Sequence, residues 1–259
     1  MKAADLFSLK NRVALVTGAS SGLGTQFAKA LADNGAAVAL VARRADRLLD
    51  LQQSIEAAGG RALAIEADVT DRAAMTRAFD AAEKAFGTIT ILVNNAGIAQ
   101  SPRRAIDVSE EEWRKVLSVD LDAVFYNAQE AARRLLAAKQ PGAIINIASV
   151  LGLGVSKGVA AYATAKACVV QVTKALAVEL AFKGVRVNAI APGWFVTEIN
   201  EDYLMSEAGA AIKREIPMGR FGQDGDLDGA LLLLASDAGS YITGATIVVD
   251  GGQVVMIKG

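Results

Sequence analysis

The stretch Thr17-Gly18-Ala19-Ser20-Ser21-Gly22-Leu23-Gly24 lies between an apolar run, residues 13–17, and a helical pattern that begins near Leu23. Its three glycines allow a sharp turn and a close approach of the backbone to a ligand. The N–H groups at the start of the following helix attract an anion such as a pyrophosphate. The alternative is a tight strand-to-helix turn that binds nothing. The glycine spacing, the preceding strand and the following helix together favour the phosphate site.

Outward from this stretch, short apolar runs alternate with longer helical segments. The runs that predict strands cover residues 13–17, 37–41, 62–66, 89–93, 143–147, 185–190 and 245–250. The helical segments cover residues 23–34, 44–58, 71–86, 109–139, 160–183 and 224–236. Strands that are apolar throughout are typical of burial on both faces. The pattern therefore predicts an α/β fold, a single-domain, doubly wound (Rossmann-like) sheet of seven parallel strands with helices on both faces.

The domain organisation follows from the same pattern. Nothing inside the chain is typical of a linker, so residues 1–259 are expected to form one dinucleotide-binding and catalytic domain. The weakly patterned stretch at residues 194–221 interrupts the alternation after the sixth strand. We expect it to be a lid over the substrate.

Composition excludes several classes of protein. The chain has no histidine, which excludes a Ser-His-Asp hydrolase and a His-ligated zinc enzyme, and no metal is expected. The net charge is −1 and no basic stripe is present, so no nucleic-acid partner is expected. The single cysteine, Cys168, fits a reducing compartment. With no signal-peptide or membrane-spanning pattern either, the chain is expected to be cytoplasmic and free of the membrane.

Tyr162 and Lys166 lie four positions apart at the start of the 160–183 helix, so they share one helix face. Alone, this pair is a weak signal that occurs on ordinary helix surfaces. Ser149 strengthens it, because this residue follows the strand at 143–147. Parallel sheets present active-site groups at the carboxyl ends of their strands. The three residues form the candidate catalytic group.

With these motifs, nearly the whole chain resembles the short-chain dehydrogenase/reductase superfamily. The resemblance rests on the spacing Gly18-xxx-Gly22-x-Gly24, on Asp68-Val69, on Asn94-Asn95-Ala96-Gly97, and on Ser149 with Tyr162-xxx-Lys166. It implies a nicotinamide cofactor. The residues that it implies for the cofactor are Gly18, Ser20, Ser21, Gly22, Leu23, Gly24, Asp68, Val69, Asn95, Ala96, Gly97, Tyr162, Lys166, Pro192, Gly193, Val196 and Thr197. Considered alone, Asp68 would more often be an N-cap for the helix that starts near Asp71.

The resemblance also implies the chemical roles. Ser149 would orient the substrate oxygen, Tyr162 would exchange its proton, and Lys166 would hold the nicotinamide ribose. A phenol titrates near pH 10, so bringing it to about 7.5 takes roughly 3.4 kcal/mol in favour of the phenolate. One ammonium about 4–5 Å away supplies on the order of 3–4 kcal/mol at an effective dielectric constant of 20. Lys166, helped by the oxidised nicotinamide, is sufficient.

The end of the second strand bears on which nicotinamide is used. An NAD site usually has a carboxylate there for the ribose 2′-hydroxyl, whereas this chain has Ala42-Arg43-Arg44. Arg43 is suited to pair with a 2′-phosphate, and Arg44 adds charge. The sequence therefore favours NADP over NAD, although Ser21 stands where many NADP-using relatives carry a basic residue. Alternatively, both arginines solvate the start of the next helix.

Asp120 is a departure from the family pattern, which usually has asparagine in a Val-Asn-Leu context that supports a water relay to the lysine. This chain has Val119-Asp120-Leu121. The negative charge is expected to stabilise Lys166 and to oppose a tyrosinate at Tyr162. The alternative is an exposed or helix-capping aspartate.

The expected reaction moves a hydride between the cofactor and a secondary alcohol or ketone. The predicted substrate contacts are Gln100, Leu151, Leu153, Trp194 and Tyr203, which are chiefly apolar and favour a neutral substrate. Substrates that are 3-oxoacyl or sugar-derived remain open. The resemblance implies a homotetramer. Two other interpretations are an epimerase or dehydratase of the same fold, and a nucleotide-binding regulatory protein with little catalysis.

Overall fold

The computed structural model describes residues 2–198 and 200–256, and its centre is a sheet in the order β3-β2-β1-β4-β5-β6-β7. All six neighbouring pairs are parallel. The strands are β1 (Val13–Thr17), β2 (Ala37–Ala42), β3 (Arg61–Glu66), β4 (Ile91–Asn94), β5 (Gly142–Ile147), β6 (Val185–Pro192) and β7 (Thr246–Val249). The winding direction reverses between β1 and β4. Open α/β sheets bind ligands at the carboxyl ends of the strands beside such a reversal.

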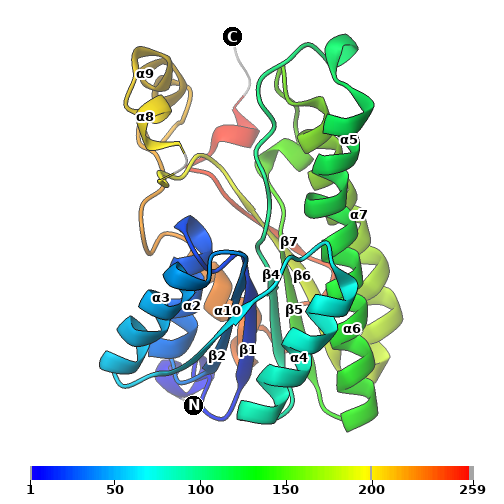
Figure 1. Ribbon diagram of the computed structural model, residues 1–259. Helices are drawn as coiled ribbons and strands as arrows, with labels where there is room; N and C mark the ends of the chain where they lie inside the picture. Colours follow the sequence, from blue (N-terminus) through cyan, green and yellow to red (C-terminus); the bar gives the residue numbers. More distant parts are fainter. Residues whose placement is uncertain (1, 199, 257–259) are drawn as a thin grey trace.

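Helices cover both faces of the sheet (Figure 1). One face carries α2 (Gly22–Asp33), α3 (Ala45–Ala57) and α10 (Asp228–Ala235). The other carries α4 (Arg72–Phe86), α6 (Ala123–Ala138) and α7 (Ala160–Leu180). The shorter elements are α1 (Ala3–Leu6), η1 (Ala105–Asp107), α5 (Glu110–Leu117), η2 (Ser118–Asp122), η3 (Val150–Gly152), η4 (Ala181–Lys183), α8 (Glu201–Leu204), α9 (Glu207–Arg214), η5 (Asp237–Gly239) and η6 (Gln253–Val255).

Alternating side chains of the central strands build the two halves of the core. Val16 of β1 points into the layer that contains Phe27 of α2, whereas the neighbouring Leu15 belongs to the layer with Phe79 of α4. All four side chains are buried because both faces of β1 are covered. The predicted doubly wound, seven-stranded fold is thus confirmed.

Several elements differ from the predicted boundaries; for example, the helix predicted at 224–236 begins at Asp228 as α10, and the strand predicted at 185–190 continues to Pro192 as β6. The sequence predicts the fourth strand at residues 89–93, whereas β4 spans Ile91–Asn94; the Thr90 hydroxyl just before it accepts a hydrogen bond from the Val13 N–H. The helix expected at 109–139 is interrupted by η2, a π-helical turn that separates α5 from α6. A single π-helical turn inserted in a helix often accompanies a functional site.

The stretch after β6 contains α8 and α9, which stand apart from the layered body at the end of the molecule where the described chain also finishes (Figure 1). These helices have a small core of their own, built on Leu204, Ile216 and Phe221. Trp194 and Val196 pack against it from the segment that leaves β6. The segment is therefore a locally packed unit at the carboxyl edge of the sheet.

Among residues 2–198 and 200–256, no helix is long and apolar enough to cross a membrane. The same residues contain no group of three or more cysteine or carboxylate side chains placed to hold a metal ion.

Candidate active site

The glycine-rich turn after β1 is closely packed against the turn after β4. Gly18 has φ +68°, and a Cβ there would lie 2.8 Å from the Ala96 Cα. A Cβ on Gly24 would collide with the carbonyl group of Gly18, so the first turn of α2 also lies directly on this loop. Only glycine fits both positions.

Hydrogen bonds hold these two turns together. The Thr17 hydroxyl accepts from the backbone N–H groups of Asn95 and Ala96, each at 3.0 Å. The Asn95 amide donates to the carbonyl oxygens of Thr17 and Gly18 at 2.9 and 3.3 Å. Its neighbour Asn94 is buried and donates to Asn146 of β5, so it joins the two strands rather than the loop.

The first turn of α2 offers its N–H groups to a ligand. Its N-cap residue, Ser21, makes no side-chain hydrogen bond to the helix, and its Oγ instead accepts from Arg44 at 2.6 Å. Arg44 also donates to Ser20, so its guanidinium braces the loop beside the start of α2. Leu23, the second residue of α2, packs on the core. Open N–H groups, a helix N-terminus and a cation fit the pyrophosphate of a dinucleotide.

Arg43 and Asp68 lie near each other beyond the ends of the paired strands β2 and β3. Within the described residues, the exposed Arg43 guanidinium has no hydrogen-bonded partner, which leaves it available to a ligand. Asp68 accepts from the Thr70 N–H and hydroxyl, and these bonds, together with Arg43, hold the pKa of its carboxyl group below the usual range.

The helix-capping interpretation of Asp68 is wrong. The N-cap of α4 is Asp71, whose carboxylate accepts from the N–H groups of Ala73 and Ala74. Asp68 lies three residues before that position, and its carboxylate accepts from Thr70 instead. Val69 beside it is half-buried against the core.

A buried ion pair lies at the centre of the candidate site. Lys166 Nζ is 3.1 Å from Asp120 Oδ1 and donates to the carbonyl oxygen of Ile147 at 3.0 Å. The Lys166 side chain is 4% exposed and that of Asp120 is 0% exposed. The alternatives of an exposed or helix-capping Asp120 are therefore wrong: the π-helical turn η2 carries this carboxylate inward to the lysine.

The ion pair keeps Lys166 protonated. Burial by itself lowers the pKa of Lys166, but the attraction of Asp120 and the proximity of Tyr162 outweigh it, and the pKa rises above the usual 10.5. A group whose pKa is higher in the folded protein than in the unfolded one stabilises the fold fully at any pH below its unfolded-state pKa. That stabilisation is lost as the pH rises through the folded-state pKa. The ammonium is thus present throughout the neutral range.

Tyr162 lies on the same helix as Lys166, and Ser149 lies at the start of η3, which packs against that helix. Tyr162 is half-buried in the first turn of α7, and Lys166 Nζ is 5.5 Å from the centre of its ring. Ser149 is buried, follows β5 and caps η3 by accepting from the Leu151 N–H at 3.1 Å. A Cβ on Gly152 of η3 would lie 2.7 Å from the Lys166 backbone, so η3 packs directly on α7.

The segment that leaves β6 returns to the glycine-rich turn. A Cβ on Gly22 would lie 3.2 Å from the Thr197 Cγ2 atom, so Thr197 covers the start of α2. Pro192 ends β6, and Gly193 lies against Asp250, where a Cβ would come within 2.7 Å of the Asp250 Cβ. Val196 turns its side chain into the small core of the α8–α9 unit.

The predicted substrate residues divide into two groups. Leu151, Leu153, Trp194 and Tyr203 are partly exposed, and the ring centres of Trp194 and Tyr203 lie 6.3 Å apart. Gln100 differs from them because it is buried at the start of α7.

Two residues that support the site, Asn200 and Ile98, are not predicted by the sequence pattern. Asn200 accepts from the Thr197 N–H at 2.8 Å and donates to the Phe195 carbonyl oxygen, which fixes the turn over α2. The backbone N–H of Ile98 donates to Asp120 Oδ2 at 3.1 Å. A backbone N–H such as that of Ile98 is present in every residue but proline, so the sequence does not single it out as a donor. The spacing from Thr197 to Asn200, by contrast, is typical of a local turn and is a usable signal.

Comparisons with known proteins agree with this geometry. Residues 18–253 match the family model described as enoyl-(acyl carrier protein) reductase. The chain is 42% identical to 3beta-hydroxysteroid dehydrogenase 1 of Eggerthella lenta over 95% of both chains, and 39% identical to gluconate 5-dehydrogenase of Gluconobacter oxydans over 98% of both. It superposes with a TM-score of 0.93 on a gluconate 5-dehydrogenase from Burkholderia cenocepacia in complex with NADP and tartrate, at 35% identity over 99% of this chain and 100% of that one.

The family match spans most of the chain, and these relatives, which are named as dehydrogenases, cover almost its full length. Their agreement supports an oxidoreductase over a regulatory protein of the same fold. The chain belongs to the short-chain dehydrogenase/reductase superfamily and is an NAD(P)-dependent oxidoreductase of that family.

Proposed function

We propose that this enzyme interconverts a neutral secondary alcohol and its ketone, with NADP(H) as the preferred cofactor and Tyr162 as the acid/base. The observation that carries the proposal is the buried Lys166–Asp120 pair beside Tyr162, at the carboxyl edge of the sheet and next to the glycine-rich turn. An ammonium in that position favours a phenolate when a proton must be accepted.

The roles of the side chains follow from their places. Ser149 offers a hydroxyl to the substrate oxygen at the end of β5, and Tyr162 gives its phenolic proton to that oxygen during reduction or takes it during oxidation. Lys166 keeps its charge close to Tyr162 and has further N–H donors for a ribose hydroxyl. A bound nicotinamide supplies the hydride chemistry. The residues named for it in the sequence fit a dinucleotide, because Ser21 leaves the first N–H groups of α2 without a side-chain cap and Arg44 lies beside them.

The preference for NADP(H) rests on charge. Arg43, whose guanidinium has no hydrogen-bonded partner within the described residues, and Arg44, which braces the glycine-rich loop, put two cations beyond the end of β2. Neither Ala42 nor Arg43 provides a carboxylate for a ribose 2′-hydroxyl. The relative from Burkholderia cenocepacia, whose structure contains NADP, supports the same preference.

The preference for a neutral substrate also rests on charge. Arg103 and Arg104 lie on the loop that contacts Gly158, just before α7. Arg103 Nε is 3.5 Å from Glu112 Oε2 and Arg104 Nε is 2.6 Å from Asp107 Oδ2, so each is neutralised by a carboxylate. The exposed side chains expected to meet the substrate, such as Leu153 and Tyr203, are apolar or phenolic.

The proposal also covers the domain organisation, the lid and the cellular location. Residues 1–259 form one domain, and residues 194–221 close over the substrate as a lid, although residues 1, 199 and 257–259 of these two ranges lie outside the described residues. Thr197 already covers Gly22 in the structure, which supports a lid that responds to the cofactor. A single cysteine supports a cytoplasmic enzyme.

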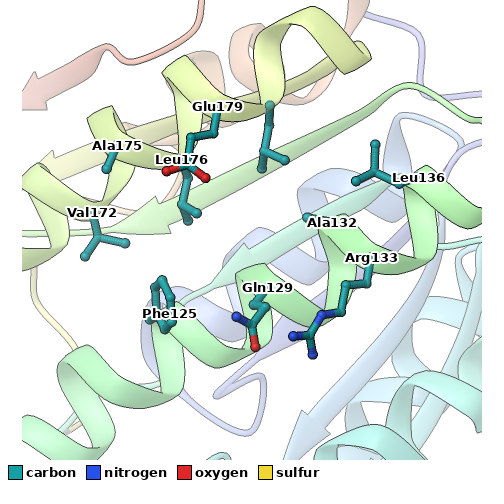
Figure 2. Close-up of a pocket in the computed structure, with 10 residues that line it drawn as sticks. Phe125, Gln129, Ala132, Arg133, Leu136, Val172, Ala175, Leu176 and Glu179 are labelled. Atoms are coloured by element: carbon teal, nitrogen blue, oxygen red, sulfur yellow. The ribbon is translucent and has the colours of Figure 1, made fainter.

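A homotetramer accounts for the exposed face of α6 and α7. Side chains of the two helices, among them Phe125, Leu136, Val172 and Leu176, line a cavity of about 290 Å³ (Figure 2). Arg133 and Glu179 on the same face carry opposite charges, so two copies related by a two-fold axis can pair them. Val178 of α7 and Phe182 of η4 are 82% and 92% exposed, and burying such side chains between copies favours association.

Replacing Tyr162 by phenylalanine tests the function itself. We expect the change to lower turnover of a ketone panel by roughly 100-fold or more, since no acid remains to protonate the product oxygen. Absorbance at 340 nm with NADPH and with NADH measures the rate. Tyr241→Phe, at a fully exposed tyrosine before β7, should retain wild-type turnover. Undiminished activity in Tyr162→Phe would reject the mechanism.

Replacing Arg43 by alanine tests the cofactor preference. The loss of one charge-assisted pair to the 2′-phosphate should lower kcat/KM for NADPH by roughly 10- to 100-fold and leave kcat/KM for NADH nearly unchanged. The matched control is Arg61→Ala at the start of β3, where the guanidinium lies over the Phe86 ring at the other end of the sheet. Equal losses with both cofactors would contradict a 2′-phosphate contact.

Replacing Asp120 by asparagine tests its electrostatic coupling to Tyr162. Removing one negative charge beside Lys166 makes the phenolate easier to form, so the pH–rate profile for alcohol oxidation should move down by about one pH unit. Asp122→Asn, an exposed aspartate in the same turn, should leave the profile in place. An unchanged profile in Asp120→Asn would show that Asp120 does not couple to Tyr162.

Replacing Ala175 by glutamate tests the assembly. Ala175 is exposed on α7 and lines the α6–α7 cavity, so a charge there disfavours burial between copies without disturbing the core. Sedimentation velocity should give a tetramer for the wild type and smaller species for Ala175→Glu. Ala57→Glu, at an exposed alanine of α3, should remain a tetramer. A monomeric wild type would refute the assembly proposal.

A further inference from the structure

The helix that carries Tyr162 begins without a cap of its own. Val159 occupies the N-cap position of α7, with φ −128° and ψ 40°, and its side chain has no atom that accepts a hydrogen bond. The N–H groups in the first turn of a helix have no partner within the helix, so an uncapped start frays. The first turn of α7 contains the tyrosine that must be held still.

Gln100 supplies the missing cap from another part of the chain. Its Oε1 atom accepts from the backbone N–H of Ala161 at 3.0 Å and from that of Tyr162 itself at 3.2 Å. These are the second and third residues of α7, the positions that an ordinary N-cap side chain serves. Gln100 is 6% exposed, so water does not compete freely for these bonds.

The loop that presents Gln100 is anchored on both sides. The Ile98 N–H donates to Asp120 Oδ2 at 3.1 Å, and the Arg103 N–H donates to the Gly158 carbonyl oxygen at 2.9 Å. Through Asp120 the first anchor leads to Lys166. Gln100 therefore connects the start of α7 to the same loop that bonds to Asp120, the carboxylate partner of Lys166.

The side chain at position 100 is a neutral amide. Its Nε2 atom is buried and has no hydrogen-bonded partner among the described residues. A carboxylate would accept from the same two N–H groups and would suit a helix N-terminus better. It would also put a negative charge beside the backbone of Tyr162, where it opposes a phenolate.

We infer that Gln100 is a positioning residue for the reaction, which fixes the first turn of α7 and so holds the Tyr162 hydroxyl against the substrate oxygen. This inference rests on the proposed function. Gln100 acts through α7 and takes no part in the proton transfer.

Two variants test it, Gln100→Leu, which has no acceptor, and Gln100→Glu, which keeps one. In Gln100→Leu, kcat for ketone reduction should fall by roughly 10- to 100-fold with little change in KM for NADPH, because a shift of about 1 Å in a catalytic group is enough for such a loss. Gln100→Glu should keep kcat within a few-fold of wild type at its own optimum. Its pH–rate profile for oxidation should move to higher pH.

Amide hydrogen exchange in residues 160–166 supplies a readout that needs no turnover. Exchange should be faster in Gln100→Leu and unchanged in Gln140→Leu, a matched change at an exposed glutamine before β5. Unaltered exchange or unaltered kcat in Gln100→Leu would overturn the inference, and so would equal damage in Gln100→Glu. A wild-type enzyme that reduces no ketone would instead reject the proposed function, and the exchange rates would still decide whether Gln100 is the cap.

Discussion

The arrangement of the site depends on one buried charge, the ammonium of Lys166. A protein interior accepts an ion only when a partner of opposite charge and further hydrogen bonds replace its water. Here Asp120 and the Ile147 carbonyl oxygen do so, at 3.1 and 3.0 Å. Because α7, η2 and the end of β5 each contribute one of these groups, the position of Lys166 fixes three elements relative to one another.

The neighbouring backbone is shaped by this requirement. Gly97 must lack a side chain, because a Cβ there would lie 2.7 Å from Asp120 Oδ1. Gly152 must also lack a side chain, because η3 packs directly against the Lys166 backbone. The π-helical turn η2 directs the Asp120 side chain inward to Lys166. In an uninterrupted α-helix, the same residue would lie on a different helix face. Removing either ion would leave the other buried without a partner, which costs about 3–5 kcal/mol.

The turn after β4 joins the two halves of the site. Asn95 bonds to the glycine-rich turn that would hold the pyrophosphate, Ile98 bonds to Asp120, and Gln100 bonds to the start of α7. Six consecutive residues thus connect the phosphate end of the cofactor site with the lysine and the tyrosine. The turn leaves the sheet at the reversal between β1 and β4, where both sets of loops come together.

The sequence by itself determined the periodic features of this protein. The apolar strands, the glycine spacing at Gly18, Gly22 and Gly24, and the Tyr162-to-Lys166 interval depend on residues that are near in sequence, and so they predicted the sheet and the candidate catalytic group. The sequence also singled out Asp120 as unusual. It predicted one uninterrupted helix at residues 109–139, because a single π-helical turn shifts the apolar positions by only about one residue, which is too little for a short pattern to reveal.

Only the tertiary structure decided which groups meet across long separations. Asp120 and Lys166 are in contact only because η2 and α7 pack together, and Gln100 caps α7 across 61 residues of chain. The competition between Asp68 and Asp71 for the start of α4 was also settled by backbone geometry, since both have the same side chain. Hydrogen bonds depend on distance and direction in space, and a linear pattern records neither when the partners belong to different elements.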